Sequence, residues 1–465
     1  MIRGTGPRAV VAAAASAILF RYGTGLAPLW WCAWLAPLPV LLLASRTRAR
    51  VAVAAAFVAW LVGESGLWSY YTGSDGLAQP IPLVAGVFVA LAALFAGVVA
   101  GFGYLVPRNA AAAALFPPAA WVLVEYALSV ATPNGLFWSL AYTQVDALPV
   151  VQLAAITGPW GLTFAVLGLP SAVAAASAAP RPSRIRLAAA ALCCLAFIWG
   201  NGLTRLAAAA EPASGHTVGV VALAQPADPV ALSTEEGRRL LDGYVARVRA
   251  VGARTVVLPE KVFAADESTL PLLDEAFRTV ARESTVDIVV GLTLTRAGTT
   301  HNVALVYPRG GAAASEYRKA HLVPTLEDAM TAGRDRTLVA GDDGRRGIAV
   351  CKDLDYPELV RAYRADGARL MLVPAWDFDR DAWLHSRMAI LRGVENGLPI
   401  ARAARSGTLT VTDAYGRVLA EDRASAVAPV PPAAGRTVYS VLGEWFVWLC
   451  LPLLALGWLR RPGRP

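Results

Sequence analysis

The chain carries little charge for its length. Only 16% of its 465 residues are Asp, Glu, Lys or Arg, whereas 56% are hydrophobic, and the mean hydropathy is +0.48. A soluble enzyme of this size needs more charged surface and fewer apolar residues. This composition excludes an ordinary soluble protein and indicates that most of the first half of the chain lies in a membrane.

Cysteine and histidine are also scarce. Of the 5 cysteines, only Cys351 lies in the long polar stretch of the chain, and the others lie in long apolar runs, so a disulfide framework is excluded. Those others are Cys32, Cys193, Cys194 and Cys450. The 4 histidines form no cluster in the sequence, which argues against a metal site. No cofactor is expected.

Long apolar runs fill the first half of the chain and its end. Each approaches the roughly 20 residues that cross a hydrocarbon core. The runs cover residues 9–20, 25–44, 51–67, 81–105, 110–130, 158–176, 187–200 and 438–459. We therefore predict a membrane bundle of about eight helical spans, in which the first run is an uncleaved helix because further runs follow it.

Basic residues fall in every second connection between these runs. They are Arg3 and Arg8, then Arg46, Arg48 and Arg50, then Arg108, then Arg181, Arg184 and Arg186, and finally Arg460, Arg461 and Arg464. Because Lys and Arg are retained on the cytoplasmic side, this pattern places the polar block 216–432 on the outer face. The net charge of +8 is thus a topology signal, and no nucleic-acid partner is expected. We predict three parts: a helix bundle at 1–210, a soluble domain on the outer face at 215–432, and a last helix with a basic tail at 436–465.

Short apolar segments alternate with amphipathic ones inside the polar block. Segments rich in β-branched residues predict strands at 217–223, 255–258, 286–294, 302–306, 347–350, 370–373, 400–404 and 409–413. Segments with helical periodicity predict helices at 234–251, 270–283, 358–365 and 381–396. Such alternation is typical of a layered α/β fold with a largely buried sheet.

Three chemically active side chains stand at the ends of these segments. Glu260 follows the apolar run 255–259, Lys319 follows the extended segment 315–318, and Cys351 ends the run 347–350. Sheet edges of this kind usually carry the chemistry of α/β folds. An acid, an amine and a thiol in that order suggest covalent acyl chemistry. The alternatives are a plain ion pair of Glu260 with Lys319 and a small buried cysteine in a strand.

The residues around these three side chains resemble a known superfamily. Leu-Pro-Glu260, Tyr-Arg-Lys319-Ala-His-Leu-Val-Pro and Ala-Val-Cys351-Lys-Asp are similar to the Glu, Lys and Cys motifs of the nitrilase, or carbon-nitrogen hydrolase, superfamily. The apolar half adds a second resemblance, because residues 133–144 and 152–158 are similar to the outer loop of bacterial apolipoprotein N-acyltransferases. That family has a nitrilase-like domain between its last two spans, so the resemblance covers essentially the whole chain.

The resemblance implies an αββα sandwich carried on membrane helices, in the cytoplasmic membrane of a bacterium with the catalytic domain on the outer face. It implies an enzyme that moves an acyl chain from a phospholipid to the N-terminal amine of a diacylglyceryl-cysteine lipoprotein. In that reaction Cys351 is the nucleophile, Glu260 the base and Lys319 the oxyanion stabiliser. Glu327 matches the second glutamate of the family, which orients the lysine and the amine. A solvated loop acid is the alternative for Glu327.

Some residues depart from the family pattern. Lys352 stands where these acyltransferases usually have an aromatic residue, Asp353 where they usually have Glu, and Thr325-Leu326 where they usually have Phe-Gly. These positions lie in loops that shape the donor and acceptor pockets, so an acyltransferase with a different amine acceptor stays open. The candidates for substrate binding are Trp138, Tyr142, Trp376 and Lys352, although tryptophan also anchors chains at membrane interfaces.

Two further classes of function stay open. One is a membrane-tethered amidase or nitrilase-type hydrolase, in which water resolves the acyl-enzyme. The membrane half argues against it, since hydrolysis of soluble amides needs no membrane. The other is a catalytically silent scaffold or lipid-binding protein, which the joint presence of Glu260, Lys319 and Cys351 disfavours.

Overall fold

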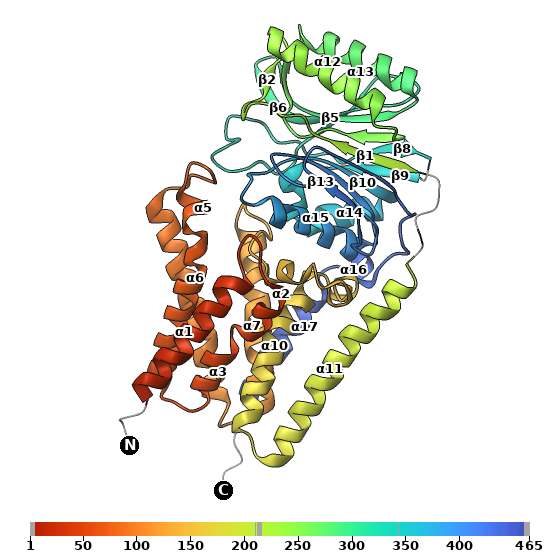
Figure 1. Ribbon diagram of the computed structural model, residues 1–465. Helices are drawn as coiled ribbons and strands as arrows, with labels where there is room; N and C mark the ends of the chain where they lie inside the picture. Colours follow the sequence, from red (N-terminus) through yellow and green to blue (C-terminus); the bar gives the residue numbers. More distant parts are fainter. Residues whose placement is uncertain (1–4, 210, 212–215, 343, 460–465) are drawn as a thin grey trace. The chain divides into compact units, whose positions relative to one another are not determined.

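The computed structural model describes residues 5–209, 211, 216–342 and 344–459, and these residues divide into two compact units (Figure 1). The helical unit comprises Met1–Ala131, Trp138–Thr204 and Glu444–Pro465. The α/β unit comprises Thr132–Phe137 and Arg205–Gly443. The short segment Thr132–Phe137 therefore packs with the α/β unit, although the chain on both sides of it belongs to the helical unit.

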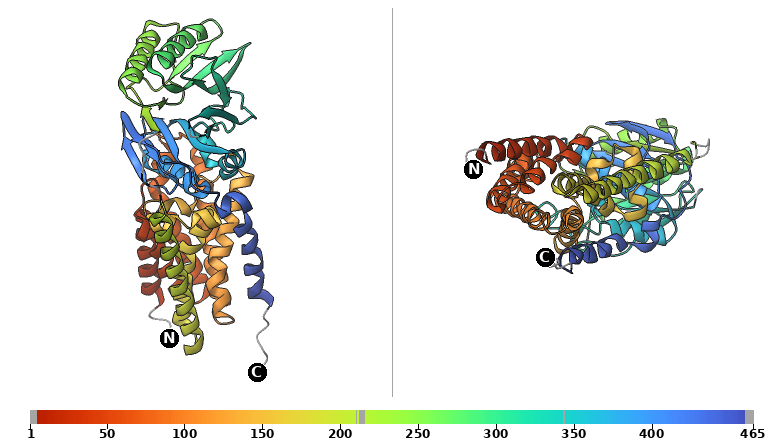
Figure 2. Two further views of the ribbon diagram at one scale, coloured as in Figure 1. Left: turned by 90° about the vertical axis from the view of Figure 1, so that its right-hand side faces the viewer. Right: turned by 90° about the horizontal axis from the view of Figure 1, so that it is seen from below.

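The helical unit is built from helices of very different lengths (Figure 2, left). Its helices are α1 Thr5–Gly23, α2 Trp30–Leu35, α3 Leu38–Ala44, α4 Ala49–Glu64, η1 Ser65–Leu67, α5 Trp68–Thr72, α6 Ile81–Leu105, α7 Ala110–Ala131, η2 Leu140–Gln144, α8 Leu148–Val151, α9 Ala154–Thr157, α10 Pro159–Ala178, α11 Arg181–Ala207 and α17 Trp445–Leu459. Small alanines let the helices approach closely, and an aromatic cluster of Phe20, Trp60, Phe95 and Trp121 fills the space between four of them.

Among the described residues, five segments are long and apolar enough to cross a membrane. They are Ala49–Thr72, Ile81–Leu105, Ala110–Ala131, Pro159–Ala178 and Arg181–Ala207. This finding supports the predicted membrane part, while the span count of about eight stays a prediction. Four of the basic residues used for the orientation, Arg3, Arg460, Arg461 and Arg464, lie outside the described residues.

Two predicted spans are interrupted in the structure. The run 25–44 is broken at Pro37, where α2 has ended and α3 begins, because proline has no backbone N–H to continue a helix. The run 438–459 is broken at Gly443, whose φ of 59° ends a short helix, α16 Val438–Leu442. The helix α16 belongs to the α/β unit, and only α17 joins the helical unit.

The α/β unit contains two sheets packed face to face. The first has the order β14-β1-β3-β5-β4-β2, with β6 and β7 added antiparallel beyond β5, and the second has the order β13-β12-β11-β10-β9-β8. The strands are β1 Thr217–Val221, β2 Val230–Ala231, β3 Thr255–Val257, β4 Phe263–Asp266, β5 Asp287–Arg296, β6 Thr299–Tyr307, β7 Ser315–Arg318, β8 Thr337–Gly341, β9 Gly344–Ile348, β10 Ala368–Trp376, β11 Ile400–Arg405, β12 Leu409–Thr412, β13 Val418–Asp422 and β14 Ser425–Pro429.

Three hydrophobic layers hold these sheets and their helices together (Figure 1). Helices α12 Glu235–Ala250 and α13 Leu270–Ser284 cover the outer face of the first sheet. Helices α14 Pro357–Ala365 and α15 Ala382–Asn396 cover that of the second. A central layer of valines, leucines and alanines from both sheets lies between them. This arrangement is the predicted αββα sandwich.

All of the predicted strands and helices of the polar block are present. The parallel inner strands are buried on both faces, and therefore their sequences are runs of β-branched residues that predict strands clearly. The six strands that were not predicted, β2, β4, β7, β8, β13 and β14, are at most five residues long and mostly lie at sheet edges. Their register comes from the neighbouring strand rather than from their own sequence.

Candidate active site

Glu260 lies three residues after β3, at the carboxyl end of a parallel strand. Its backbone N–H donates to the carbonyl oxygen of Ala375 at 3.2 Å, which ties this turn to β10 of the second sheet. Gly291 on β5 lies against the same turn, and a Cβ there would come within 2.4 Å of the carbonyl oxygen of Pro259. The close approach of the two backbones therefore requires glycine and keeps Glu260 buried.

Lys319 connects two buried carboxylates. It follows β7, and its backbone N–H donates to the carbonyl oxygen of Asn302 on β6 at 2.9 Å. Its Nζ lies 2.8 Å from Oε1 of Glu260 and 2.9 Å from Oε2 of Glu327. All three side chains are at most 1% exposed. The structure thus brings together three of the predicted site residues, and Glu327 is a buried ion-pair partner rather than a solvated acid.

Asn302 joins the two carboxylates from a further side. Its Nδ2 donates to Oε1 of Glu260 at 2.6 Å and to Oε1 of Glu327 at 2.7 Å. Because carboxylates only accept hydrogen bonds, the amide must turn its nitrogen toward them. Its Oδ1 is buried and accepts no hydrogen bond from the described residues. Asn302 therefore holds both acids in position.

The two glutamates have different hydrogen-bond environments. Glu327 receives donors on both oxygens, because Lys261 and Asn302 donate to Oε1 while Lys319 and the backbone N–H of Val323 donate to Oε2. Glu260 receives both of its hydrogen bonds on Oε1, and its Oε2 accepts none from the described residues. A free oxygen is what a base needs to take up a proton. Glu260 fits that role, whereas Glu327 does not.

Cys351 begins a short 3-10 helix, η3 Cys351–Asp355, just after β9. Its φ of 47° is rare for a residue with a side chain, and such strain is common at functional sites. The carboxylate of Asp353 fixes this turn by accepting from the backbone N–H of Val350 at 2.9 Å and from the hydroxyl of Tyr317 at 2.7 Å. The thiol of Cys351 donates to the carbonyl oxygen of Trp376 at 3.4 Å.

Burial and charge set the protonation states of these groups. Burial alone would lower the pKa of Lys319, but the carboxylates of Glu260 and Glu327 hold it well above its usual value. Burial raises the pKa of Glu327, yet Lys319 and Lys261 outweigh it and bring the value down to about 2. Burial and the charge of Glu260 raise the pKa of Cys351 well above its usual value. At neutral pH the site therefore holds a lysine cation, an ionised Glu327 and a protonated thiol.

Comparison with known proteins covers both halves of the chain. Residues 217–427 match the family model described as carbon-nitrogen hydrolase, and residues 16–172 match that of the apolipoprotein N-acyltransferase N-terminal domain. The apolipoprotein N-acyltransferase of Geobacter metallireducens is 28% identical over 92% of this chain and 89% of that one. That of Haemophilus ducreyi is 24% identical over 93% of both chains.

The chain belongs to the apolipoprotein N-acyltransferase family. Among solved structures, an amidase from Nesterenkonia sp. is 20% identical over 54% of this chain and 99% of that chain, with a TM-score of 0.41.

The remaining predicted site residues of this acyltransferase family member fall in different places. The indole of Trp376 lies beside Lys261, whose Nζ is 4.2 Å from the centre of the ring. Trp138 and Tyr142 belong to the helical unit, where Trp138 stacks on Tyr71 at a ring distance of 4.9 Å and Tyr142 is buried.

Two of the positions that depart from the family pattern, Lys352 and Asp353, lie in η3. Lys352 pairs with Asp355, whose carboxylate lies 3.3 Å from its Nζ. Asp353 accepts from the backbone N–H of His321 at 2.9 Å, and the imidazole of His321 stacks on Tyr356 at 3.6 Å. Asp353 therefore holds the Cys351 turn in place although its side chain is one carbon shorter than that of glutamate.

One histidine joins an acidic group that the sequence did not reveal. Oxygens of Asp377 and Asp381 and a ring nitrogen of His385 lie within 4.8 Å of one another. However, both terminal nitrogens of the Arg402 guanidinium donate to the Asp377 carboxylate. Although burial lowers it, the pKa of His385 is raised to about 10 by these two carboxylates. Asp377, Asp381, His385 and Arg402 therefore form a buried ion-pair network.

Two residues of the site, Lys261 and Asn302, were missed from the sequence. A signal for one of them exists, because the chain has only 3 lysines among its 42 basic residues. All of them, Lys261, Lys319 and Lys352, are buried near the catalytic group. All other basic positions of the chain hold arginine, so a lysine marks these three positions. Asn302 lies within a predicted strand, and nothing in its own segment distinguishes it.

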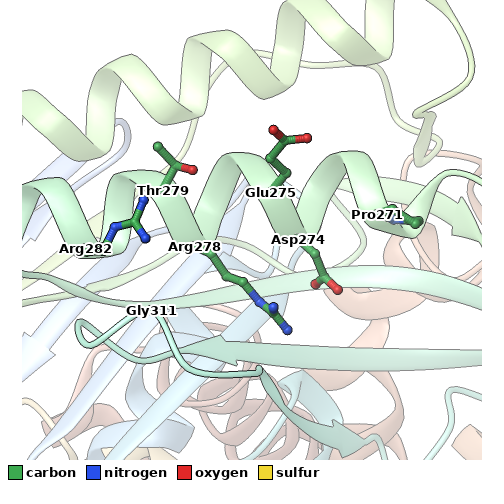
Figure 3. Close-up of a pocket in the computed structure, with 7 residues that line it drawn as sticks. All are labelled: Pro271, Asp274, Glu275, Arg278, Thr279, Arg282 and Gly311. Carbon is green, nitrogen blue, oxygen red and sulfur yellow. The ribbon is translucent and has the colours of Figure 1, made fainter.

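A surface hollow of about 490 Å³ lies elsewhere in the α/β unit, along α13. Figure 3 shows its lining, which comes from α13 and from the loop at Gly311. The lining residues are Pro271, Asp274, Glu275, Arg278, Thr279, Arg282 and Gly311. None of the predicted site residues is among them, and its charges of both signs do not suit an acyl chain.

Proposed function

We propose that this protein is an acyltransferase that moves a fatty acyl chain from a membrane phospholipid, through a thioester on Cys351, to the N-terminal amine of a diacylglyceryl-cysteine lipoprotein. The observation that carries the proposal is the pairing, in one chain, of the acyltransferase family's membrane domain with the buried Glu260–Lys319 ion pair and a half-buried Cys351. The membrane half supplies the lipid environment that a hydrolase of soluble amides does not need.

In the first half-reaction Glu260 activates the thiol. The neutral thiol of Cys351 passes its proton to Glu260 as the sulfur attacks the ester carbonyl carbon of the phospholipid. The carbonyl oxygen becomes an oxyanion, which the cationic Lys319 stabilises. The carbon–oxygen bond then breaks, the lysophospholipid alkoxide takes the proton from Glu260, and the acyl chain remains on sulfur as a thioester.

In the second half-reaction the amine replaces the sulfur. The incoming neutral amine attacks the thioester carbon and gives a proton to Glu260, while Lys319 again faces the oxyanion. The carbon–sulfur bond breaks and the sulfur recovers the proton from Glu260. Glu327 takes no proton in either step. It keeps Lys319 positively charged and in place.

The place of the enzyme in the cell follows from the same proposal. The helical unit crosses the cytoplasmic membrane of a bacterium with about eight helical spans, counting the last helix of the chain. The domain boundaries 1–210, 215–432 and 436–465 and the outward-facing catalytic domain are kept as predicted from the charge pattern. The donor phospholipid and the acceptor lipoprotein are both anchored by their acyl chains in the outer leaflet of this membrane, on the same face as the proposed catalytic domain.

The test is intact mass spectrometry of the detergent-purified protein after incubation with phospholipid. We expect a hydroxylamine-sensitive acyl adduct on the wild type and none on Cys351→Ala, because a thioester needs the sulfur. A synthetic diacylated lipopeptide should then remove the adduct and appear as its N-acylated product. Discharge of the adduct by water at the same rate without lipopeptide would point instead to a hydrolase. An adduct on Cys351→Ala would remove the nucleophile assignment.

A further inference from the structure

Arg405, the last residue of β11, is a buried cation that no described acid contacts in an ion pair. The residue is 2% exposed. Its Nη1 donates to the carbonyl oxygen of Lys261 at 3.2 Å. Its Nε and Nη2 are buried and donate to nothing among the described residues, and Arg405 makes no ion pair with them. A buried charge in this state is costly, which makes it a candidate for binding an anion that comes from outside.

The free nitrogens have the right geometry for an anion with two oxygens. Nε and Nη2 lie on one edge of the planar guanidinium, so their N–H bonds are parallel. This edge binds two oxygens of a carboxylate or a phosphate at once. Nη1, on the other edge, is the nitrogen that donates to the carbonyl oxygen of Lys261. Arg405 is thus held by the protein at one edge and left open at the edge that recognises oxyanions.

Arg405 also differs from the two lysines beside it. Lys261 and Lys319 pair with the carboxylates of Glu260 and Glu327, whereas Arg405 contacts the ring of Trp376 and forms no ion pair with the described residues. Burial lowers the pKa of its guanidinium, and the charge of Glu260 opposes this fall only in part.

Trp376 connects this cation to the reacting sulfur. Its backbone carbonyl oxygen accepts from the thiol of Cys351 at 3.4 Å. Its ring has Arg405 Cζ at 4.4 Å and Lys261 Nζ at 4.2 Å from the ring centre. The cation therefore lies about one tryptophan side chain away from the sulfur that would take the acyl chain.

A second unused donor lies near Arg405. Burial raises the pKa of the Tyr244 hydroxyl to about 12, and the charge of nearby Arg405 opposes this rise. The hydroxyl donates to Oε1 of Gln225 at 3.1 Å. The Nε2 of Gln225 is buried and has no acceptor among the described residues. Nε and Nη2 of Arg405 and Nε2 of Gln225 are thus unused donors, and they match a ligand that offers acceptor oxygens.

We propose that Arg405, with Gln225 and the Lys261–Trp376 contact beside it, forms the subsite that receives the phosphodiester of the donor phospholipid. This inference rests on the proposed function, which supplies a donor whose phosphate and reacting ester are joined through glycerol. Two non-bridging phosphate oxygens accept from Nε and Nη2, which places the ester at Cys351. The subsite selects donors by the phosphate that all glycerophospholipids share, whatever the rest of the headgroup.

The experiment compares two donors with the same acyl chains, phosphatidylglycerol and diacylglycerol, by the rate of thioester formation on Cys351. Loss of a bidentate charged hydrogen bond should lower the phospholipid-to-diacylglycerol rate ratio by about 10- to 100-fold in Arg405→Gln. Arg405→Lys should lie between the two because it keeps the charge but not the two-pronged edge. Arg423→Gln is the control, since Arg423 is exposed and its ratio should equal that of the wild type.

Three outcomes of the donor comparison would contradict the inference. An equal loss with both donors in Arg405→Gln would mean that Arg405 only supports the fold, and would refute the inference alone. If inorganic phosphate raises the melting temperature of the wild type while the donor ratio is the same in Arg405→Gln, the subsite binds free phosphate and the headgroup assignment is overturned. Absence of a wild-type thioester with either donor would refute the proposed function, and the inference with it.

Discussion

Replacing Glu327 by glutamine tests the division of roles between the two glutamates. The Glu327 carboxylate accepts from Lys261, Lys319, Asn302 and a backbone N–H, and a glutamine of the same shape removes its charge. The fall of its pKa from 4.5 to about 2 corresponds to about 3 kcal/mol of folding stability. Breaking a buried ion pair generally costs about 3–5 kcal/mol, so the two estimates agree.

The assay is thermal unfolding of the detergent-purified protein at several pH values. A loss of about 3 kcal/mol lowers the melting temperature of a domain of this size by roughly 6–12 °C. Because the folded-state pKa of Glu327 is depressed, its stabilisation is complete above about pH 4.5 and disappears as the pH falls to about 2. The gap between the wild type and Glu327→Gln should therefore be largest at neutral pH and narrow through that window.

The matched control is Asp328→Asn, the same chemical change on the next residue. Asp328 is exposed and caps the backbone N–H of Thr325 at 2.9 Å, so its loss should change stability by about 0.5 kcal/mol at most. The reasoning would be refuted by a melting temperature of Glu327→Gln within a degree or two of the wild type at pH 7. A gap that stays constant from pH 7 to pH 3 would refute the ionised state of Glu327.

Two further predictions concern its neighbours. Glu260→Gln removes a negative charge that raises the pKa of Cys351. Cys351 should therefore react faster with iodoacetamide at pH 8 than in the wild type, as measured by peptide mass spectrometry, while thioester formation is lost. Slower alkylation would contradict the effect of the Glu260 charge on the thiol pKa. Asn302→Ala should lower the free energy of unfolding by about 1–3 kcal/mol because two buried carboxylates lose a donor. Asn302→Asp should lower it further because it adds a third negative charge. A melting temperature of Asn302→Asp at or above that of Asn302→Ala would contradict this account.

The αββα sandwich and the position of Cys351 at the end of one of its strands could be predicted from local sequence. The inner parallel strands are runs of β-branched residues because both of their faces are buried, and the amphipathic helices follow the 3.6-residue period of a surface helix. Glu260, Lys319 and Cys351 stand at the ends of such segments, where each signal involves only a few neighbouring residues. The membrane segments are equally local, since apolar length alone marks them.

The breaks in two predicted spans could not be predicted from apolar length. Pro37 stands inside a run that is apolar on both sides, and Gly443 separates a short helix that packs on the α/β unit from the last apolar helix. A hydropathy average does not register a single residue that lacks an N–H or adopts a positive φ. Whether such a residue ends or merely bends a helix depends on what its neighbours pack against.

Sequence alone determined which residues could do acyl chemistry, and only the tertiary structure decided what each one does. Glu260 and Glu327 are the same residue type, yet one has a free oxygen and the other has none, because Asn302, Lys261 and Lys319 arrive from segments up to 66 residues away. The open edge of Arg405 likewise depends on which acceptors are absent around it. Hydrogen bonds and charge balance are properties of neighbours in space, and a linear pattern does not contain them.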